Sequence, residues 1–408
     1  MPKTIQLDGR TLEGGGQLLR IAIGLSALTQ QPLSITDIRG NRSGGGGLKL
    51  QHLTCVQWLS RACGAPTQGA EKKSRTLQFF ARDHDAASLK IVRGGWEKLE
   101  TSIDIGSPGA VGLVFQAIVP YIFFAGAMHS EGEGEGEVHV TIKGGTNVSN
   151  SPSVDYIEHV LLPMLEKVGL PRIEVRVRSR GWSTGRTEMG AVTFTIRPLR
   201  RGVSLQAFQL ADRGEITRIG AHVLAPRAAE KHIHRELKAA LASAGLEDIP
   251  TNIHYELSGH EKRLYILLVA HTSTGFRIGR DNLFQERFST LDYAIPQLVR
   301  RAVEELKSEI EHGGCVDEFM LDQLAVYQAL AKGRSSIEMG SSERSLHART
   351  GHWVAREMLG AEFDEGGGCE GVGWVVGQKW VRQRRGESEE DVDGLAAEVG
   401  GLDLEAST

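Results

Sequence analysis

The pattern of apolar and polar positions predicts one α/β unit that occurs three times along the chain. In the first copy, apolar residues recur at helical spacing over 16–29, and alternation with polar residues predicts a strand over 33–38. A loop rich in glycine and arginine follows at 39–47, then a helix over 48–63 and a strand over 76–81. The unit therefore runs helix, strand, polar loop, helix, strand.

Two later segments repeat this order. In the second copy the predicted elements are a helix over 107–127, a strand over 137–143, a polar loop over 144–152, a helix over 154–168 and a strand over 173–178. In the third copy they are a helix over 319–331, a strand over 335–339, a polar loop over 340–345 and a helix over 347–359. Repetition of one supersecondary unit implies that the copies pack as equivalents, in a pseudo-threefold arrangement.

In each copy the polar loop precedes a helix, where free backbone N–H groups and the helix dipole favour anions. One such loop alone is no more than an ordinary helix cap. Two of them, however, carry arginines, namely Arg39, Arg42 and Arg344. We therefore expect the loops at 39–47, 144–152 and 340–346 to face one anion-binding site.

The segment 209–312 follows a different pattern, with predicted helices over 225–244 and 291–311 and a strand over 264–274. It is long enough to form a small α/β domain inserted into a larger one. The predicted fold class is thus α/β, with three repeated units in a large domain and a smaller inserted domain. The predicted boundaries are 1–208 for the first two repeats, 209–312 for the insert, 313–381 for the third repeat and 382–408 for a disordered acidic tail.

Composition narrows the class of protein. The 408 residues are 40% apolar and 24% charged, as in soluble globular proteins. Because the net charge is −4, nucleic acid could bind only at a local basic surface. The four cysteines show no CxxC spacing, which disfavours a zinc site and favours a reduced, intracellular chain. The start of the sequence has no signal-like apolar run. The apolar stretch 110–127 is interrupted by Gln116 and Pro120, so we expect a core helix and no membrane association.

His347 is the candidate nucleophile. It stands at the start of a predicted helix, between Arg344 and Arg349, and a neutral histidine there can attack phosphorus while arginines stabilise the developing charge. A capping or partly buried histidine is the ordinary alternative, since the chain has 14 histidines. His352 is the weaker candidate, because five residues along a helix it points elsewhere.

Glu13 precedes the run Gly14–Gly16, and a carboxylate beside a glycine turn can hold a divalent cation that also touches phosphate. A glutamate favoured by the helix dipole is the simpler alternative. Arg20, Arg39 and Arg42 form a possible phosphate clamp. The glycine run is neither a P-loop, because no Gly-Lys-Ser or Gly-Lys-Thr follows, nor a GxGxxG dinucleotide fingerprint.

Three groups of motifs stand out along the chain. The first is Leu7-Asp8-Gly9, Glu13-Gly14-Gly15-Gly16-Gln17 and Arg20, followed by Arg39, Arg42 and Gln51-His52-Leu53. The second is Gly144-Gly145-Thr146-Asn147, Pro152 and Asp155-Tyr156. The third is Asp317-Glu318-Phe319-Met320-Leu321-Asp322-Gln323-Leu324, followed by Leu346-His347 and Thr350. Taken together, these motifs resemble the RNA 3′-terminal phosphate cyclase family over about residues 5–363.

The resemblance implies a ligase that uses ATP to convert an RNA 3′-phosphate to a 2′,3′-cyclic phosphodiester through a histidine–AMP intermediate, releasing AMP and pyrophosphate. It implies that His347 carries AMP and that Glu13 holds Mg²⁺ or Mn²⁺. Its implied ATP-binding residues are Gln116, Pro152, Tyr156, Phe319, Asp322 and Gln323, with Pro152 and Phe319 enclosing adenine and Asp322 reading its edge. Its implied phosphate- or RNA-binding residues are Arg20, Arg39, Arg42, Gln51 and His52.

Two loops depart from the family pattern. The segment 43–48 lacks the usual Pro-Gly-Leu, and 183–190 replaces a triple-glycine turn. One alternative is therefore a non-catalytic branch of the family that acts in ribosome assembly and lacks the histidine. Another is an enolpyruvyl transferase, which has repeated α/β units but no use for His347. The partners we expect are ATP and RNA, with no protein partner evident, and the expected location is the nucleus, with the cytoplasm as the alternative.

Overall fold

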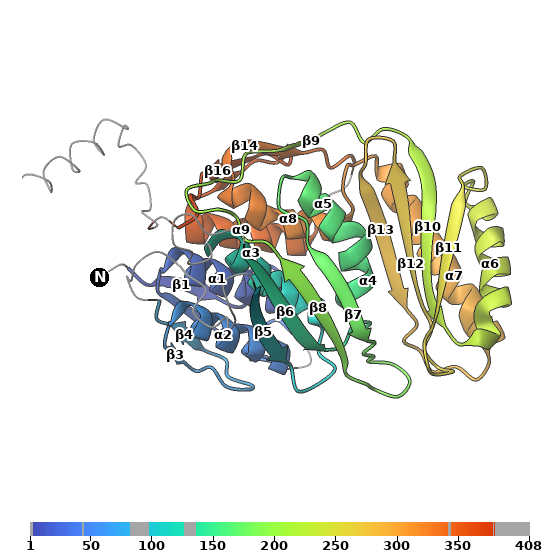
Figure 1. The fold of residues 1–408 in the computed structure, drawn as a ribbon, viewed down its shortest axis with the longest axis horizontal. Helices are drawn as coiled ribbons and strands as arrows, with labels where there is room; N and C mark the ends of the chain where they lie inside the picture. Colours follow the sequence, from blue (N-terminus) through green and yellow to red (C-terminus); the bar gives the residue numbers. More distant parts are fainter. Residues whose placement is uncertain are drawn as a thin grey trace, which may run out of the picture.

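The computed structural model describes residues 3–42, 45–81, 98–125, 136–341, 344–377 and 379. The predicted acidic tail over 382–408 lies outside these residues. Within them the chain forms four four-stranded sheets and the helices that cover them (Figure 1). The fold is α/β, as the sequence predicts.

The first repeat occupies the N-terminal part of the chain. Its elements are β1 (Ile5–Asp8), α1 (Gly16–Thr29), β2 (Leu33–Thr36), α2 (Leu50–Cys63), β3 (Thr67–Gln68) and β4 (Leu77–Phe79). The sheet order is β1-β2-β4-β3, in which β1 runs parallel to β2 and the other pairs are antiparallel.

The second and third repeats have the same topology. The second contains β5 (Lys98–Asp104), α3 (Val111–Ala125), β6 (Glu137–Gly144), α4 (Val154–Tyr156), η1 (Ile157–Leu161), α5 (Leu162–Lys167), β7 (Glu174–Ser179) and β8 (Gly190–Ile196). The third contains β9 (Gln209–Leu210), α8 (Glu318–Leu330), β14 (Lys332–Ile337), α9 (Leu346–Leu359), β15 (Glu362–Phe363) and β16 (Cys369–Val372). The sheet orders β5-β6-β8-β7 and β9-β14-β16-β15 repeat the parallel pair and the antiparallel pairs of the first sheet.

The repeat differs from its predicted form in three ways. Each sheet contains a later strand that the pattern did not predict, which is β3 in the first copy, β8 in the second and both β15 and β16 in the third. Each copy begins with an extra strand, β1, β5 or β9, and β1 and β9 are only four and two residues long, too short for an alternation pattern. The helix predicted over 154–168 also contains a π-helical turn, η1, between α4 and α5. Such turns are rare and have no periodicity signal of their own.

The inserted segment forms a separate unit at one end of the molecule (Figure 1). Its elements are β10 (Ile216–Ala225), η2 (Arg227–Ala229), α6 (Glu230–Ser243), β11 (Thr251–Leu257), β12 (Tyr265–Thr272), β13 (Arg277–Leu283) and α7 (Leu291–His312). Its side chains form a hydrophobic cluster distinct from that of the repeats. The predicted helix start at 225 is wrong: Ala225 ends β10, because a residue that precedes a proline, here Pro226, disfavours helical backbone.

Helices from the three repeats pack on one another in the middle of the large domain, with α1 against α2, α3 and α9, and α8 against α3 and α9 (Figure 1). Thirteen of the fifteen residues of α3 are buried, which confirms the predicted core helix. Among the helices of the described residues, none combines the length and apolar character needed to cross a bilayer.

Asp317 links three parts of the fold. Its carboxylate caps α8 by accepting a hydrogen bond from the backbone N–H of Met320 (2.9 Å). It also accepts bonds from the hydroxyl of Tyr156 in the second repeat (2.6 Å) and the N–H of Gly279 in the insert (2.8 Å). A buried carboxylate needs such donors, so its position fixes the insert and two repeats relative to one another.

Because the insert has its own core, its stability should respond separately to mutation. Leu237 on α6 is 1% exposed, and Leu237→Ala should cost about 2–5 kcal/mol through lost contacts and the cavity left behind. Hydrogen exchange followed by mass spectrometry should show that the variant exchanges faster than the wild type, and that this increase is larger in 216–312 than in 5–79. The matched change Leu59→Ala, in the core of the repeats, should reverse this order. Equal acceleration in both regions for both variants would show that the two cores open as one unit.

Candidate active site

Glu13 lies at the centre of the candidate site, in the glycine-rich turn that leads into α1. Its side chain is only 5% exposed, and its Oε1 forms an ion pair with Arg42 of the first polar loop. The same oxygen is 3.6 Å from Nε2 of His347, at the start of α9. The backbone N–H of Glu13 donates to Oγ1 of Thr350 on α9 (3.2 Å). Residues far apart in the sequence therefore meet at one buried carboxylate.

The glycines of this turn allow a close approach. A Cβ atom on Gly16 would lie 2.4 Å from Nε2 of His52 and 2.9 Å from Nη1 of Arg20, and Gly14 has a φ of +59°. No side chain caps the N-terminus of α1 or of α2. The first backbone N–H groups of both helices are thus available to an anion.

Arg20 and His52 are buried beside these helix ends. Burial lowers the pKa of Arg20 to about 10, so the guanidinium remains charged at neutral pH, and its Nε donates to Oε1 of Gln116 (2.9 Å). Burial, followed by the positive charge of Arg20, holds the pKa of His52 well below 6.5, so that ring is neutral. Its Nδ1 is buried without a hydrogen-bond partner in the described chain. A buried cation beside an unsatisfied neutral imidazole suits a phosphate group.

His347 is held by a capped helix end. The hydroxyl of Ser345 accepts the N–H of Ala348 and caps α9. The His347 side chain is 52% exposed. Partial burial is the main cause that lowers the pKa of His347 below 6.5, and the charges of Arg20 and Arg42 add to it. The imidazole is therefore neutral at pH 7, the form in which it is a nucleophile.

Other candidates fall in different places. Arg349, two residues after His347 on the helix, is turned about 200° away from it. His352 is 7% exposed and stacks on Phe363, with ring centroids 4.1 Å apart, so it does not share the Glu13 contact.

Two predicted phosphate ligands have structural contacts here. Arg39 adopts a left-handed backbone conformation (φ +56°) and its Nη1 donates to the carbonyls of Gly45 (3.4 Å) and Gly47 (3.2 Å), so it holds the first polar loop together. Oε1 of Gln51 accepts the N–H of Ala110, just before α3 (3.2 Å). A phosphate-binding role for either residue stays a prediction.

The first polar loop reaches Glu13 through Arg42, and His347, the second residue of α9 after the third polar loop, reaches it from the other side. In the second loop, the backbone N–H groups of Thr146 (2.9 Å) and Asn147 (3.0 Å) donate to the carbonyl of Gly181, and this loop ends at Pro152.

Tyr156 lies one helical turn beyond Pro152, and its ring contacts Phe319 edge-on with centroids 5.9 Å apart. The guanidinium of Arg280, on β13 of the insert, lies 4.6 Å from the centroid of Phe319. Phe319 is partly buried and so presents aromatic surface between the repeats and the insert.

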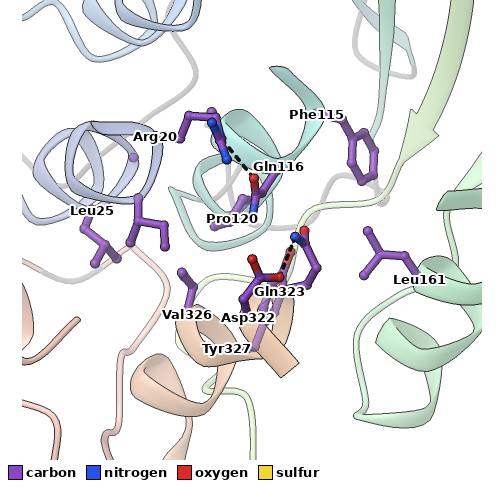
Figure 2. Close-up of a pocket in the computed structure, with 13 residues that line it drawn as sticks. Arg20, Leu25, Phe115, Gln116, Pro120, Leu161, Asp322, Gln323, Val326 and Tyr327 are labelled. Carbon is purple, nitrogen blue, oxygen red and sulfur yellow. Dashed lines mark hydrogen bonds between the residues drawn. The ribbon is translucent and has the colours of Figure 1, made fainter. Parts of the chain in front are cut away.

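Asp322 is a buried acceptor one helical turn after Phe319. Its two oxygens accept the side-chain amides of Gln17 (2.8 Å) and Gln323 (2.9 Å), and burial raises its pKa to about 7. Figure 2 shows the Gln323–Asp322 and Arg20–Gln116 pairs facing a small cavity. Its volume of about 20 Å³ leaves space for about one water molecule, so the cavity itself has no room for a nucleobase.

The sequence gives little sign of several residues in this arrangement. Arg280 lies in the insert, far from any motif. Gln17 and Thr350 belong to the motifs, but their hydrogen bonds depend on the packing of α1 against α8 and α9. Asp317 opens the third group of motifs, and its place just before a predicted helix is typical of an N-cap, but its contacts with other parts of the fold carry no sequence signal.

The donor set is compatible with a magnesium-like cation. Oε2 of Glu13 is buried without a hydrogen-bond partner among the described residues. The described residues hold no cluster of three or more metal-ligating side chains. Mg²⁺ is often bound through only one or two carboxylates together with substrate phosphates and water. One buried, unsatisfied carboxylate oxygen therefore fits such an ion.

Comparison with known proteins finds similarity to one family. Residues 11–364 match the family model described as RNA 3′-terminal phosphate cyclase. A Pyrococcus furiosus protein named RNA 3′-terminal phosphate cyclase is 30% identical over 385 residues, covering 92% of this chain and all of that protein. A protein of the same name from Methanosarcina mazei is 31% identical over 366 residues, covering 88% of this chain and 96% of its own. The chain belongs to the RNA 3′-terminal phosphate cyclase family.

Proposed function

We propose that this protein is an active cyclase that closes an RNA 3′-terminal phosphate to a 2′,3′-cyclic phosphodiester, with His347 as the residue that carries AMP. The observation that carries the proposal is the position of a neutral imidazole 3.6 Å from the buried Glu13 carboxylate, beside Arg42 and close to Arg20. That arrangement puts a nucleophile, cations and a potential metal ligand in one place.

The reaction proceeds in three transfers. A nitrogen of neutral His347 attacks the α-phosphorus of ATP, and the bond to pyrophosphate breaks. An oxygen of the RNA 3′-phosphate then attacks the same phosphorus and displaces histidine. Finally the neighbouring 2′-hydroxyl attacks the 3′-phosphorus and loses its proton, and AMP leaves with the bonding electron pair. Activation by AMP is needed because a phosphate monoester alone has a poor leaving group.

The residues around His347 have separate tasks in this scheme. Arg20 and Arg42, with the uncapped N-termini of α1 and α2, balance the charge of the ATP and RNA phosphates. Glu13 would hold a divalent cation, which when bound would shield phosphate charge and polarise the reacting phosphorus. Arg39, Gln51 and His52 are proposed to contact the phosphates of ATP or RNA.

For the base of ATP, we propose a site between Pro152 and Phe319. Tyr156 and Arg280 hold Phe319 in place through ring contacts. Asp322 offers an acceptor to the adenine amino group, with Gln323 and Gln116 nearby.

Nuclear localisation remains a proposal that rests on the family resemblance alone. The ribosome-assembly alternative is weaker, because that branch lacks the histidine that lies here beside Glu13. It would become the better account if no AMP were retained by the protein.

The nucleophile is tested by labelling with ATP that carries the label on its α-phosphate, with no RNA present. His347→Ala should abolish retention of AMP, because no other group takes the nucleophile's place. His352→Ala should keep most of it, since that ring stacks on Phe363 away from Glu13. The label should survive base and be lost in acid, where protonation of the linking nitrogen makes imidazole a leaving group. Full labelling of His347→Ala would overturn the assignment.

The metal role of Glu13 is tested by removing its charge. Glu13→Gln should reduce AMP labelling at low Mg²⁺ or Mn²⁺ and recover part of it at high concentration, as expected of one ligand among several. Asp212→Asn, a change of the same size outside the site, should leave the metal dependence unchanged. A Glu13→Gln defect of equal size at every metal concentration would argue against metal binding at this carboxylate.

The ionisation of His347 gives a pH test. A lowered pKa means that the neutral form persists below pH 6.5 and is lost only at more acidic pH. An NMR titration of the His347 ring without ATP should therefore show a midpoint below 6.5. Arg42→Gln should move that midpoint upward, because a positive charge is removed while the Glu13 carboxylate stays. A wild-type midpoint above 6.5 would contradict the proposed electrostatics.

A further inference from the structure

A second recess lies on the other side of the Glu13 turn, between that turn and the exposed face of α9. We call it the α9 cleft. Its volume is about 370 Å³, and its lining is Thr11, Leu12, Arg344, Arg349, His352, Trp353, Arg356 and Phe363. A volume of this size is within the range of pockets that bind small ligands. None of the residues assigned to the ATP site lines it.

The α9 cleft is strongly basic. Three arginines line it, and among the described residues, which leave out 342 and 343, no aspartate or glutamate does. Arg349 and Arg356 are exposed, and neither forms an ion pair with a carboxylate of the described residues. Arg344 donates to the backbone carbonyl of Asp364. Because that acceptor is neutral, the hydrogen bond does not neutralise the charge of the Arg344 guanidinium. In a chain whose net charge is −4, this is the kind of local basic surface that an anionic strand would need.

His352 supplies an independent sign of a ligand. It is 7% exposed, and neither Nδ1 nor Nε2 has a hydrogen-bond partner in the described chain. Burial and the charge of Arg344 lower its pKa to about 4, so the ring is neutral, with one donor and one acceptor. Buried polar groups without partners are uncommon in folded proteins. The ring lines the cleft, and a small movement of the side chains around it would expose its buried nitrogens to a ligand there.

The remaining walls suit a nucleobase. Trp353 is partly buried in the cleft, and Phe363 is stacked against His352. Arginines interleaved with aromatic rings are the usual pattern of sites for single-stranded nucleic acid, in which rings stack on bases and arginines contact phosphates.

The cleft is also next to the reaction site. Leu12 lines it, and the following residue, Glu13, contacts His347. Arg344 lines it three residues before His347. Arg349 and Arg356 lie on the face of α9 that is turned away from His347, so a strand whose 3′-terminal phosphate lies at His347 would pass over Leu12 and around the start of α9 to reach the cleft.

We propose that the α9 cleft binds the RNA strand upstream of its 3′-terminal nucleotide, with Arg349 and Arg356 on backbone phosphates and Trp353 against a base. His352 hydrogen bonds to the ribose or the base edge. This assignment rests on the proposed cyclase function, and it adds a strand-binding site to the nucleotide site.

The test separates strand binding from adenylylation. In the double variant Arg349→Ala/Arg356→Ala, AMP labelling by ATP without RNA should equal that of the wild type. The KM for a 3′-phosphorylated oligoribonucleotide should rise, and kcat at saturating RNA should change little. The slope of log affinity against log salt should become shallower by about 1.4, from roughly 0.7 for each single-strand phosphate contact. Trp353→Ala should weaken RNA binding about 5- to 100-fold, and Trp353→Phe should restore most of it.

Length and charge controls sharpen the result. The penalty of the double variant should be small for a two-nucleotide substrate and should grow with strand length until the cleft is filled. Arg349→Lys/Arg356→Lys should keep most of the binding, because each position retains its charge. Arg235→Ala removes an exposed arginine on α6 of the insert and should have no effect.

Two results would overturn the proposal. One is unchanged RNA affinity and salt slope in the double variant, which would place the strand elsewhere. The other is loss of ATP labelling in parallel with RNA binding, which would place the cleft in the nucleotide site. RNA binding measured by fluorescence anisotropy without ATP needs no catalysis. If the wild type neither labels nor cyclises, the proposed function fails, while the anisotropy comparison still decides whether the cleft binds RNA.

Discussion

The site depends on one buried carboxylate that cannot remain without positive partners. Glu13 is 5% exposed, and a buried charge in that position would be strongly destabilising if it were unpaired. Arg42 satisfies one oxygen, and His347 lies 3.6 Å from the same atom, while the other oxygen has no partner in the described chain. The carboxylate thereby fixes the first polar loop, and the hydrogen bond from the Glu13 backbone N–H to Thr350 holds α9 against the same turn. Nucleophile, cation and potential metal ligand are brought together at this one residue.

The repeated architecture explains how distant segments reach that carboxylate. Each repeat contributes helices to a common centre, so the beginnings of α1, α2 and α9 gather from three regions of the sequence. Asp317 has a related role on the side of the insert, because it joins Tyr156, Gly279 and the start of α8. This junction lies beside Phe319, which Tyr156 and Arg280 both contact. The insert therefore affects the proposed adenine site through that ring, although its core is separate.

Much of the fold follows from periodicity, because helices and alternating strands leave strong patterns and the same order recurs three times. The short strands β1 and β9 were not predicted, because two to four residues are too few to show an alternating pattern. The helix predicted from residue 225 begins later in the structure, because Pro226 disfavours helical backbone at the residue before it. Motifs placed Glu13 and His347 in the candidate site. They gave no indication of Arg280 or of the unpartnered ring of His352, because those depend on which surfaces meet when the units pack.

The central claim is that the imidazole beside Glu13 becomes covalently adenylylated. The most direct measurement is mass spectrometric mapping of the wild-type protein after incubation with ATP and Mg²⁺ or Mn²⁺, under conditions that preserve a phosphoramidate. The account predicts one added AMP, located on His347. AMP located on a lysine or on another histidine, or no adduct although ATP and metal are bound, would contradict it.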